Sequence, residues 1–298
     1  MRRTGLAAAA GCILLFALGP GWLGSYGAMV AWAVLLNGTL ALSFDLLGGY
    51  GGALHLGHGA FFGIGVYASA LCAAHGLTWW AAFPAAGLAG GLAARLVQPL
   101  LAPLRGVSFA MASLALLLSC GLLARNLDFF TGGSAGLSLP PTRGTALPYR
   151  WTFLVFACAF WIHDRLPDSR FGRALRAAAA DPEAAAASGV TSGMVRGRVL
   201  VLGSVLAGLA GGGYPLVMAY VSPQSAFGLE AALAPVVAVL LGGPGTRWGP
   251  LLGVLLYTGL QEWLWTRGWQ WNLAVLGIAL MAAGAFLPRG LAGLFPRR

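Results

Sequence analysis

Long apolar segments alternate with short polar connections along almost the entire chain. A membrane-spanning helix needs about 17–25 apolar residues, and fewer where a broken helix is buried in protein. On this basis the sequence predicts ten spans, at residues 5–19, 26–47, 59–75, 79–99, 107–124, 150–164, 199–220, 229–243, 249–263 and 270–287. Segments 229–243 and 249–263 also fit one interrupted element, so eight or nine spans remain open.

The composition indicates that lipid is the solvent for most of the chain. Of the 298 residues, 58% are hydrophobic and 9% are charged, whereas about 25% of an ordinary soluble domain is charged. The predicted fold class is therefore all-α: a polytopic membrane bundle of about 8–10 helices, some broken at glycines, in one domain over residues 1–298. The N-terminus resembles a signal peptide, but no polar domain follows for export, so a first spanning segment is favoured.

Arginine placement predicts the orientation of the chain. All 18 basic residues are arginine, and they lie in the connections between apolar runs. This is the usual topology signal of a membrane protein, and no nucleic-acid partner is expected. Ten spans bring both termini, Arg95, Arg105, Arg247 and the arginines of 165–198 to one side, which is then cytoplasmic. Residues 165–198 form the predicted cytoplasmic loop, and residues 125–149 form the predicted external loop.

The segment 172–190 is the only long, charge-dense stretch, and it predicts a short capped helix. Asp181 is a good N-cap, Pro182 suits the first helical position, and Glu183 complements the helix dipole. The following alanines favour helix, Gly189 ends it, and another helix is expected at about 170–179. A rigid helix in this loop suits docking of a cytoplasmic partner, although a solvated linker is the alternative. The candidate docking residues are Arg173, Arg176, Asp181, Glu183, Ala184, Ala185 and Gly189.

A second unusual segment, residues 37–70, is apolar but contains six glycines from Gly48 to Gly59. Non-helical backbone at membrane depth is tolerated only where it is buried or lines a cavity, and broken helices often border translocation sites. His55 and His58 have the spacing to share a helix face. They lack further ligands for a metal, so a structural or cavity-lining role is favoured. A similar break, Leu241–Gly245, occurs in the second half of the chain.

Two carboxylates in apolar surroundings add to these candidates. Asp45 lies late in a span, where its charge must be interfacial or paired. Glu230 opens an apolar run, where it either caps a helix or contacts a substrate. The resulting candidates for a translocation path are Asp45, Gly48, Gly51, His55, Gly57, His58, Gly59 and Glu230.

Enzymatic chemistry is not indicated. The four cysteines lie in apolar segments without metal or disulfide spacing. The sequence has no defensible catalytic triad and no nucleotide-binding P-loop. We therefore expect no cofactor, no metal and no enzyme activity, and any ATP that drives this protein must bind another subunit.

Five motifs, in order, resemble the branched-chain amino-acid ABC transporter permeases of the LivM type. They are LLGGYGGALHLGHGAFFGIGVY at Leu46–Tyr67, TGGSAGL at Thr131–Leu137, the polar segment Gly172–Val190, YVSP with the later Val239–Pro250, and PRGLAGL at Pro288–Leu294. The resemblance covers residues 40–295. His55, Ala53 and Ala135 depart from the usual family residues.

The resemblance implies a set of partners in a bacterial plasma membrane. Residues 183–189 are implied to dock on two ABC ATPase subunits. A second, homologous permease chain and a periplasmic or lipid-anchored substrate-binding protein are implied to complete the importer within membrane lipid. The implied cargo is leucine, isoleucine or valine, with related amino acids, urea and amides left open. The alternative is a self-contained secondary transporter of a small polar solute.

Overall fold

The computed structural model describes residues 24–140, 146–266, 277–278 and 290–294. The predicted span 5–19 lies outside the described residues, as does the span 270–287 apart from residues 277 and 278. The same holds for Arg2, Arg3 and the C-terminal arginines, so the predicted position of both termini stays a prediction.

The described residues form an almost entirely helical bundle, which confirms the predicted fold class. The long helices are α2 (Gly24–Gly48), α3 (His58–Ala74), α4 (Trp79–Leu101), α5 (Gly106–Asn126), α7 (Ala146–Arg165), α10 (Ser192–Gly212), α13 (Leu229–Gly242) and α14 (Gly249–Thr266). The shorter helices are α6 (Asp128–Thr131), α8 (Arg170–Ala180), α9 (Pro182–Ala187), α11 (Tyr214–Met218), α12 (Pro223–Phe227) and the 3₁₀ turns η1 (Gly133–Ala135) and η2 (Leu291–Leu294). Within the described residues, five helices are long and apolar enough to cross a membrane, and α3 is a shorter apolar helix.

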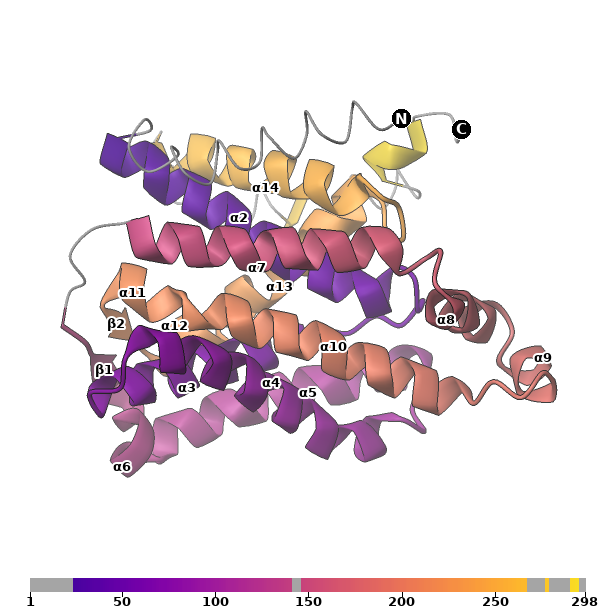
Figure 1. Cartoon of the computed structure of the whole chain (residues 1–298), viewed down its shortest axis with the longest axis horizontal. Coiled ribbons are helices and arrows are strands. Elements are labelled where there is room, and N and C mark those ends of the chain that lie inside the picture. Colours follow the sequence, from indigo (N-terminus) through magenta and orange to yellow (C-terminus); the bar gives the residue numbers. More distant parts are fainter. Residues whose placement is uncertain (1–23, 141–145, 267–276, 279–289, 295–298) are drawn as a thin grey trace.

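The long helices run along a common axis, so the bundle has two distinct ends (Figure 1). We call one the α8–α9 end. The other, the β1–β2 end, carries α6, α11 and two strands, β1 (Leu137–Ser138) and β2 (Tyr220–Val221), which pair antiparallel. The sequence reasoning missed this ladder. The helices α13 and α14 are separate and pack together, so one interrupted element over 229–263 is wrong.

Two helix boundaries differ from the predictions. Helix α10 begins at Ser192, inside the predicted loop 165–198, and α7 begins at Ala146, inside the predicted loop 125–149. A hydropathy pattern ends a predicted span at the first charged residue. A helix can nevertheless include arginines near its end, because the apolar part of each side chain stays along the helix while the guanidinium group reaches water. The first turns of α10 accordingly contain Arg196 and Arg198.

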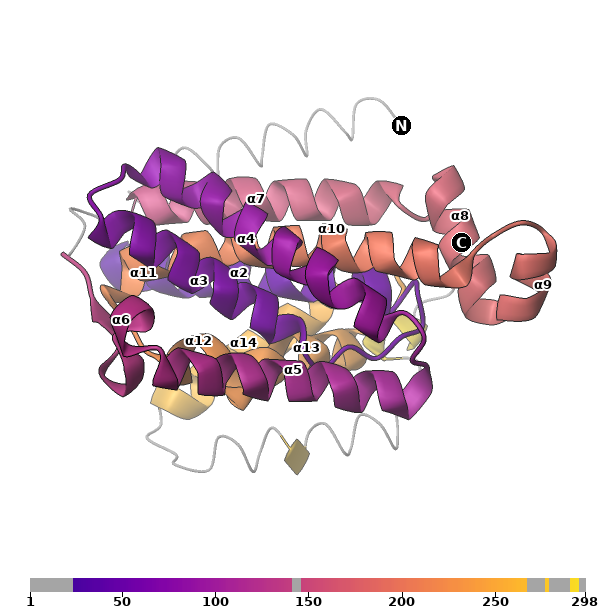
Figure 2. The same ribbon diagram turned by 90° about the horizontal axis from the view of Figure 1, so that it is seen from below.

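Small residues bring the central helices close together. Helix α10 packs against α4, α3 and α2, as seen from below in Figure 2. A Cβ at Gly208 of α10 would lie 2.5 Å from the carbonyl oxygen of Ala86 in α4, and one at Gly65 of α3 would lie 2.4 Å from the oxygen of Gly208. Such small-residue contacts are the usual way for helices to associate in lipid. In α5, by contrast, only 28% of the most apolar window is buried, so this helix lies at the periphery.

The described arginines are distributed very unevenly between the two ends. Two, Arg125 and Arg150, lie at the β1–β2 end. The other nine lie at the α8–α9 end: Arg95, Arg105, Arg165, Arg170, Arg173, Arg176, Arg196, Arg198 and Arg247. The part of the chain that the structure describes therefore has one strongly basic end.

Replacement of Gly59 tests the close packing of α3. A Cβ there would lie 2.5 Å from the Cβ and 2.8 Å from the Cα of Ala232 in α13. We expect Gly59→Val to lower the free energy of unfolding by about 1–3 kcal/mol through overpacking, measured by thermal unfolding in detergent. Gly259→Val in α14 is the control, because no other atom lies within 4 Å of its Cβ position. Equal stability of the two variants would contradict the packing.

Candidate functional site

The predicted capped helix in the polar segment is confirmed as α9. The side chain of Asp181 accepts hydrogen bonds from the backbone N–H groups of Glu183 (2.9 Å) and Ala184 (3.0 Å), and Pro182 occupies the first helical position. At the other end, the Val190 N–H donates to the Ala185 oxygen and the Gly189 N–H to the Ala186 oxygen. These two bonds, with Gly189 at φ +81°, form a Schellman C-cap. Both helix ends are therefore fixed by local bonds.

Helix α8 provides a rigid base for α9. The Ser169 hydroxyl accepts a hydrogen bond from the Gly172 N–H (2.9 Å), and Leu175 and Ala178 are buried. A Cβ at Gly172 would lie 1.8 Å from the Leu166 oxygen, so only glycine fits this tight entry. Because α8 and α9 both contact α10, their position is tied to the centre of the bundle.

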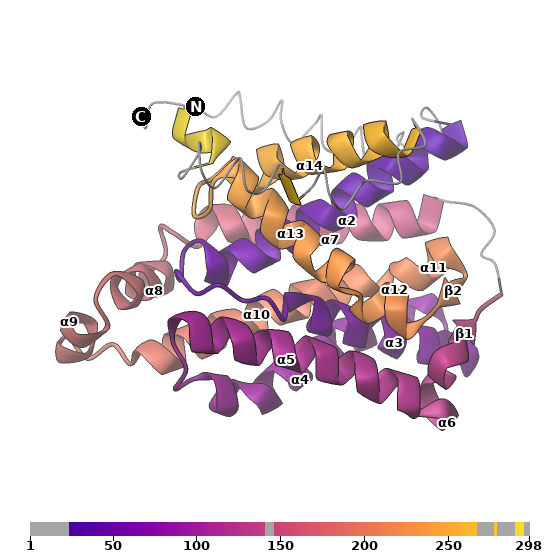
Figure 3. The ribbon, with the colours of Figure 1, turned by 180° about the vertical axis from the view of Figure 1, so that it is seen from behind.

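The exposed surface of this loop contains most of the predicted docking residues. The exposed residues are Arg173, Arg176, Asp181, Glu183, Ala184 and Gly189. The two arginines lie on α8 and donate to the backbone oxygens of Asp168 and Pro167, whereas Glu183 and Ala184 lie on α9, which protrudes from the bundle (Figures 1 and 3). Ala185 is 5% exposed and packs inward, so it supports α9 rather than offering a contact. The loop thus presents a short helix with one charged side chain among small ones.

Asp45 is hydrogen-bonded inside the protein, as expected because an unpaired carboxylate within a membrane span is energetically costly. It is fully buried, and its Oδ2 lies 2.8 Å from Nε2 of His163 in α7. Its Oδ1 accepts a hydrogen bond from the Gly245 N–H at 3.0 Å, in the connection between α13 and α14. The two glycine-rich breaks noted in the sequence also meet here, since a Cβ at Gly49 would lie 2.2 Å from the Gly245 nitrogen. Asp45 therefore joins three elements.

The two histidines of the first break do not share a helix face, so this expectation is wrong. Helix α3 begins at His58, which leaves His55 in the preceding irregular segment. His58 Nε2 lies 2.8 Å from the Ser43 hydroxyl, and the His55 ring stacks against Phe61 and lies 5.6 Å from the Phe109 ring. Both side chains are buried. Within the described residues no cluster of three metal-ligating side chains occurs.

The predicted glycines of the break lie in tight packing rather than along an open cavity. A Cβ at Gly57 would lie 2.0 Å from the Ser113 oxygen of α5, and one at Gly51 would lie 2.6 Å from the Leu47 oxygen. At Gly48 the nearest atom is a ring carbon of Phe44, at 2.7 Å. Gly57 therefore allows the chain to pass close to α5, whereas Gly48 and Gly51 fit the tight end of α2.

A polar cleft opens between α2, α12, α13 and α14. It has a volume of about 450 Å³ and contains the exposed carboxylate of Glu230, in the first turn of α13. The hydroxyl, amide and small groups around it belong to Asn37, Ser222, Gln224, Ser225, Gly228, Ala231, Ala234, Tyr257 and Gln261. Polar side chains from α2, α12 and α14 thus line the same cleft as this carboxylate.

Of the predicted path residues, only Glu230 lines this cleft. Asp45, His55, His58 and the four glycines lie in the packed interior instead. Sequence reasoning missed Asn37, Tyr257 and Gln261. The available signal was an amide side chain within a predicted apolar span, as for Asn37 in 26–47 and Gln261 near the end of 249–263.

The TGGSAGL motif, within the predicted external loop, forms an ordered turn at the β1–β2 end. The Thr131 hydroxyl bonds to the Leu127 oxygen at 2.8 Å, and Gly132, Gly133 and Gly136 adopt positive φ. The Tyr220 hydroxyl donates to the Ala135 oxygen at 2.8 Å. Two of the five sequence motifs, TGGSAGL and YVSP, therefore pack against each other.

Comparison with known proteins gives consistent matches. The family described as "Branched-chain amino acid transport system / permease component" matches residues 26–284. The chain is 24% identical to the high-affinity branched-chain amino acid transport system permease protein LivM of Escherichia coli K12, over 88% of this chain and 69% of the relative. The corresponding protein of Salmonella typhimurium is 25% identical over the same shares.

An archaeal relative matches a shorter stretch. It is the probable branched-chain amino acid transport permease protein LivM of Methanocaldococcus jannaschii, which is 31% identical over 51% of this chain and 45% of its own length. No solved structure matches the chain.

Replacement of Asp45 tests its role in joining the helices. Asp45→Ala leaves His163 and the Gly245 N–H buried without their acceptor. We expect a loss of about 2–5 kcal/mol in the free energy of unfolding, seen as a lower thermal midpoint in detergent. Asp45→Asn keeps an acceptor oxygen for Gly245 and should lose less. A thermal midpoint unchanged in Asp45→Ala would argue against this role.

Proposed function

The chain belongs to the family of permease components of branched-chain amino acid transport systems, and on this premise we propose that it docks on ATPase subunits through α9. As a family member it is a multi-pass membrane permease for branched-chain amino acids. The proposal is that this permease is part of an ATP-driven importer in a bacterial plasma membrane. A second homologous permease, two ABC ATPase subunits and an external substrate-binding protein would complete the importer.

The observation that carries this proposal is the rigid, protruding α9. Its two caps fix its shape, and α8 fixes its position. A short connection, residues 188–191, joins α9 to α10, the spanning segment with the largest buried share, 72%. A displacement of α9 by a partner would therefore be passed through this connection to the centre of the bundle. A solvated linker would need neither the caps nor the buried base.

The arginine distribution supports a cytoplasmic position for this end. Cytoplasmic connections of membrane proteins carry an excess of arginine and lysine, and nine of the eleven described arginines lie at the α8–α9 end. ATP is available on that side of a plasma membrane. The same orientation places the β1–β2 end outside, where a substrate-binding protein would deliver its cargo.

We assign the substrate path to the polar cleft. It extends from Ser222 and Gln224 near the β1–β2 end towards Asn37, in the middle of α2. Glu230 is the only carboxylate among its lining residues, so it suits the ammonium group of an amino acid, while amide and hydroxyl groups suit the carboxylate. The cleft is open to one side, which a second permease chain would close.

The placement of Asp45 disfavours a self-contained secondary transporter. Such a protein uses an ionisable group that is reachable from the transport path. Asp45 is fully buried and engaged with His163 and Gly245, outside the polar cleft. Glu230 remains as the sole carboxylate of the cleft, and a substrate ammonium group would occupy it.

The docking proposal is tested by enlarging Gly189 and removing the Glu183 charge. Loss of a central contact residue commonly weakens an interface by about 2 kcal/mol or more, so we expect Glu183→Ala with Gly189→Val to lower ATP-driven leucine uptake at least about tenfold. Uptake is measured in vesicles that contain the assembled transporter, and co-purification of the ATPase subunits is measured in parallel.

The matched control is Gly76→Val. Gly76 also has a positive φ, +75°, and open space around its Cβ position, but it lies in the α3–α4 connection at the opposite end. It introduces the same backbone strain, so it should keep uptake and subunit recovery. Normal uptake by the Glu183/Gly189 variant, or equal losses in both variants, would refute the docking proposal.

The path proposal is tested by Glu230→Gln. This change keeps the size of the side chain and removes its charge, and a hydrogen bond to a charged group is worth about 1.5–3 kcal/mol. We expect the substrate concentration for half-maximal uptake to rise, or the uptake rate to fall, at least about tenfold. Glu262→Gln, outside the cleft on α14, is the control. Equal uptake by wild type and Glu230→Gln would exclude Glu230 from the path.

A further inference from the structure

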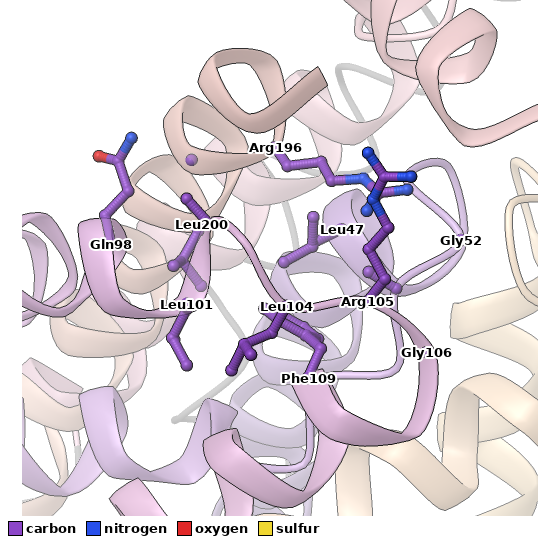
Figure 4. Close-up of a pocket in the computed structure, with 13 residues that line it drawn as sticks. Leu47, Gly52, Gln98, Leu101, Leu104, Arg105, Gly106, Phe109, Arg196 and Leu200 are labelled. Atoms are coloured by element: carbon purple, nitrogen blue, oxygen red, sulfur yellow. The ribbon is translucent and has the colours of Figure 1, made fainter. Parts of the chain in front are cut away.

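A pocket with two arginines lies at the α8–α9 end, apart from the docking loop and the polar cleft (Figure 4). Arg105 comes from the α4–α5 connection, and Arg196 comes from the start of α10. The apolar wall consists of Leu47, Leu101, Leu104, Phe109 and Leu200. The pocket encloses about 70 Å³, and one water needs about 10–15 Å³ of such space. It can therefore hold a polyatomic group.

The two guanidinium groups lie next to each other without a counter-charge. Figure 4 shows both heads at the same rim of the pocket. The pocket lining includes no acidic residue, and within the described residues neither arginine forms an ion pair. The Nε of Arg196 is buried and has no hydrogen-bond partner. A buried donor next to a like charge indicates an anionic ligand.

A second depression continues this basic surface. Arg95 and Arg198 line it, and it shares Gln98 and Ala102 with the first pocket. Its lining also lacks acidic residues. Two further arginines, one on α4 and one on α10, thus line a depression that adjoins the pocket.

The surroundings are apolar and face outward. On α4, Leu96 and Leu100 are 75% and 72% exposed, and on α5, Val107 and Met111 are 75% and 65% exposed. In a membrane protein such surfaces contact acyl chains. Basic pockets between membrane helices at this level bind anionic headgroups. A free phosphate would use the arginines but not these apolar rows.

We propose that Arg105 and Arg196 bind the phosphate of an anionic phospholipid whose acyl chains lie along α4 and α5. The site also touches Gly52 in the α2–α3 connection, and Gly52 faces Ala179 of α8. A bound phosphate would neutralise the repulsion between the arginines. It would also hold the α4–α5 connection against the start of α10, next to the docking loop.

The test is native mass spectrometry and lipid titration of the full chain, purified with the subunits that accompany it. The probes are phosphatidylglycerol, phosphatidylcholine and inorganic phosphate. Each arginine near an anionic headgroup adds a favourable electrostatic term to the binding free energy. Loss of two arginines should therefore weaken lipid binding about 30-fold. We expect Arg105→Gln with Arg196→Gln to lose phosphatidylglycerol binding by that factor. Arg150→Gln, an exposed arginine at the β1–β2 end, should retain it.

Lysine replacements and folding controls sharpen the result. Arg105→Lys with Arg196→Lys keeps the charge but loses the planar fork, so binding should be intermediate. Thermal unfolding without added lipid shows whether each variant is folded. Equal phosphatidylglycerol affinity in wild type and the glutamine variant overturns the proposal. Equal affinity for both lipids also overturns it, because the site then does not select an anionic headgroup. Displacement of phosphatidylglycerol by millimolar phosphate overturns it too and indicates a site for free anions.

Discussion

The hydrogen-bonded position of Asp45 is the constraint on which the arrangement of the bundle depends. Lipid offers no water to satisfy a buried carboxyl group, so its partners must come from the protein. Those partners are His163 of α7 and the backbone of Gly245, between α13 and α14. Because the three elements are far apart in sequence, one side chain fixes the register of three parts of the bundle at the α8–α9 end.

This constraint also explains how the polar loop that contains α8 and α9 keeps a fixed position on the bundle. Helix α7 ends two residues after His163, and Asp164 pairs with Arg247, in the same connection that contains Gly245. The segment that leads from α7 into α8 therefore begins at a fixed position. At its far end the loop enters α10, which is held by small-residue packing against α4 and α3. Helix α9 is therefore connected to rigid structure on both sides, through α8 to α7 and through residues 188–191 to α10. A displacement of α9 can then be transmitted to the bundle, as mechanical coupling requires.

The sequence was most informative where the determinants are local. The capping of α9 depends on residues within one turn, so Asp181, Pro182 and Gly189 could be assigned their positions directly. Spans follow from hydropathy alone. Asp45 and His163 are 118 residues apart, and no local pattern reports that contact. The break at His55 and the β1–β2 ladder depend likewise on tertiary contacts, as does the cleft, whose residues come from four helices.

Two faces of the bundle differ in their side chains: one is packed through small residues, and the other carries polar groups around a cleft. Glycines and alanines on α3, α4 and α10 allow backbone contact, so this region can be rigid without bulky side chains. The face formed by α2, α12, α13 and α14 instead leaves Asn37, Glu230 and Tyr257 around open space. Polar groups that face lipid are costly, so this face is stable only against water, substrate or another protein. The proposed second permease chain would cover this half-open polar cleft, with the substrate path between the two chains.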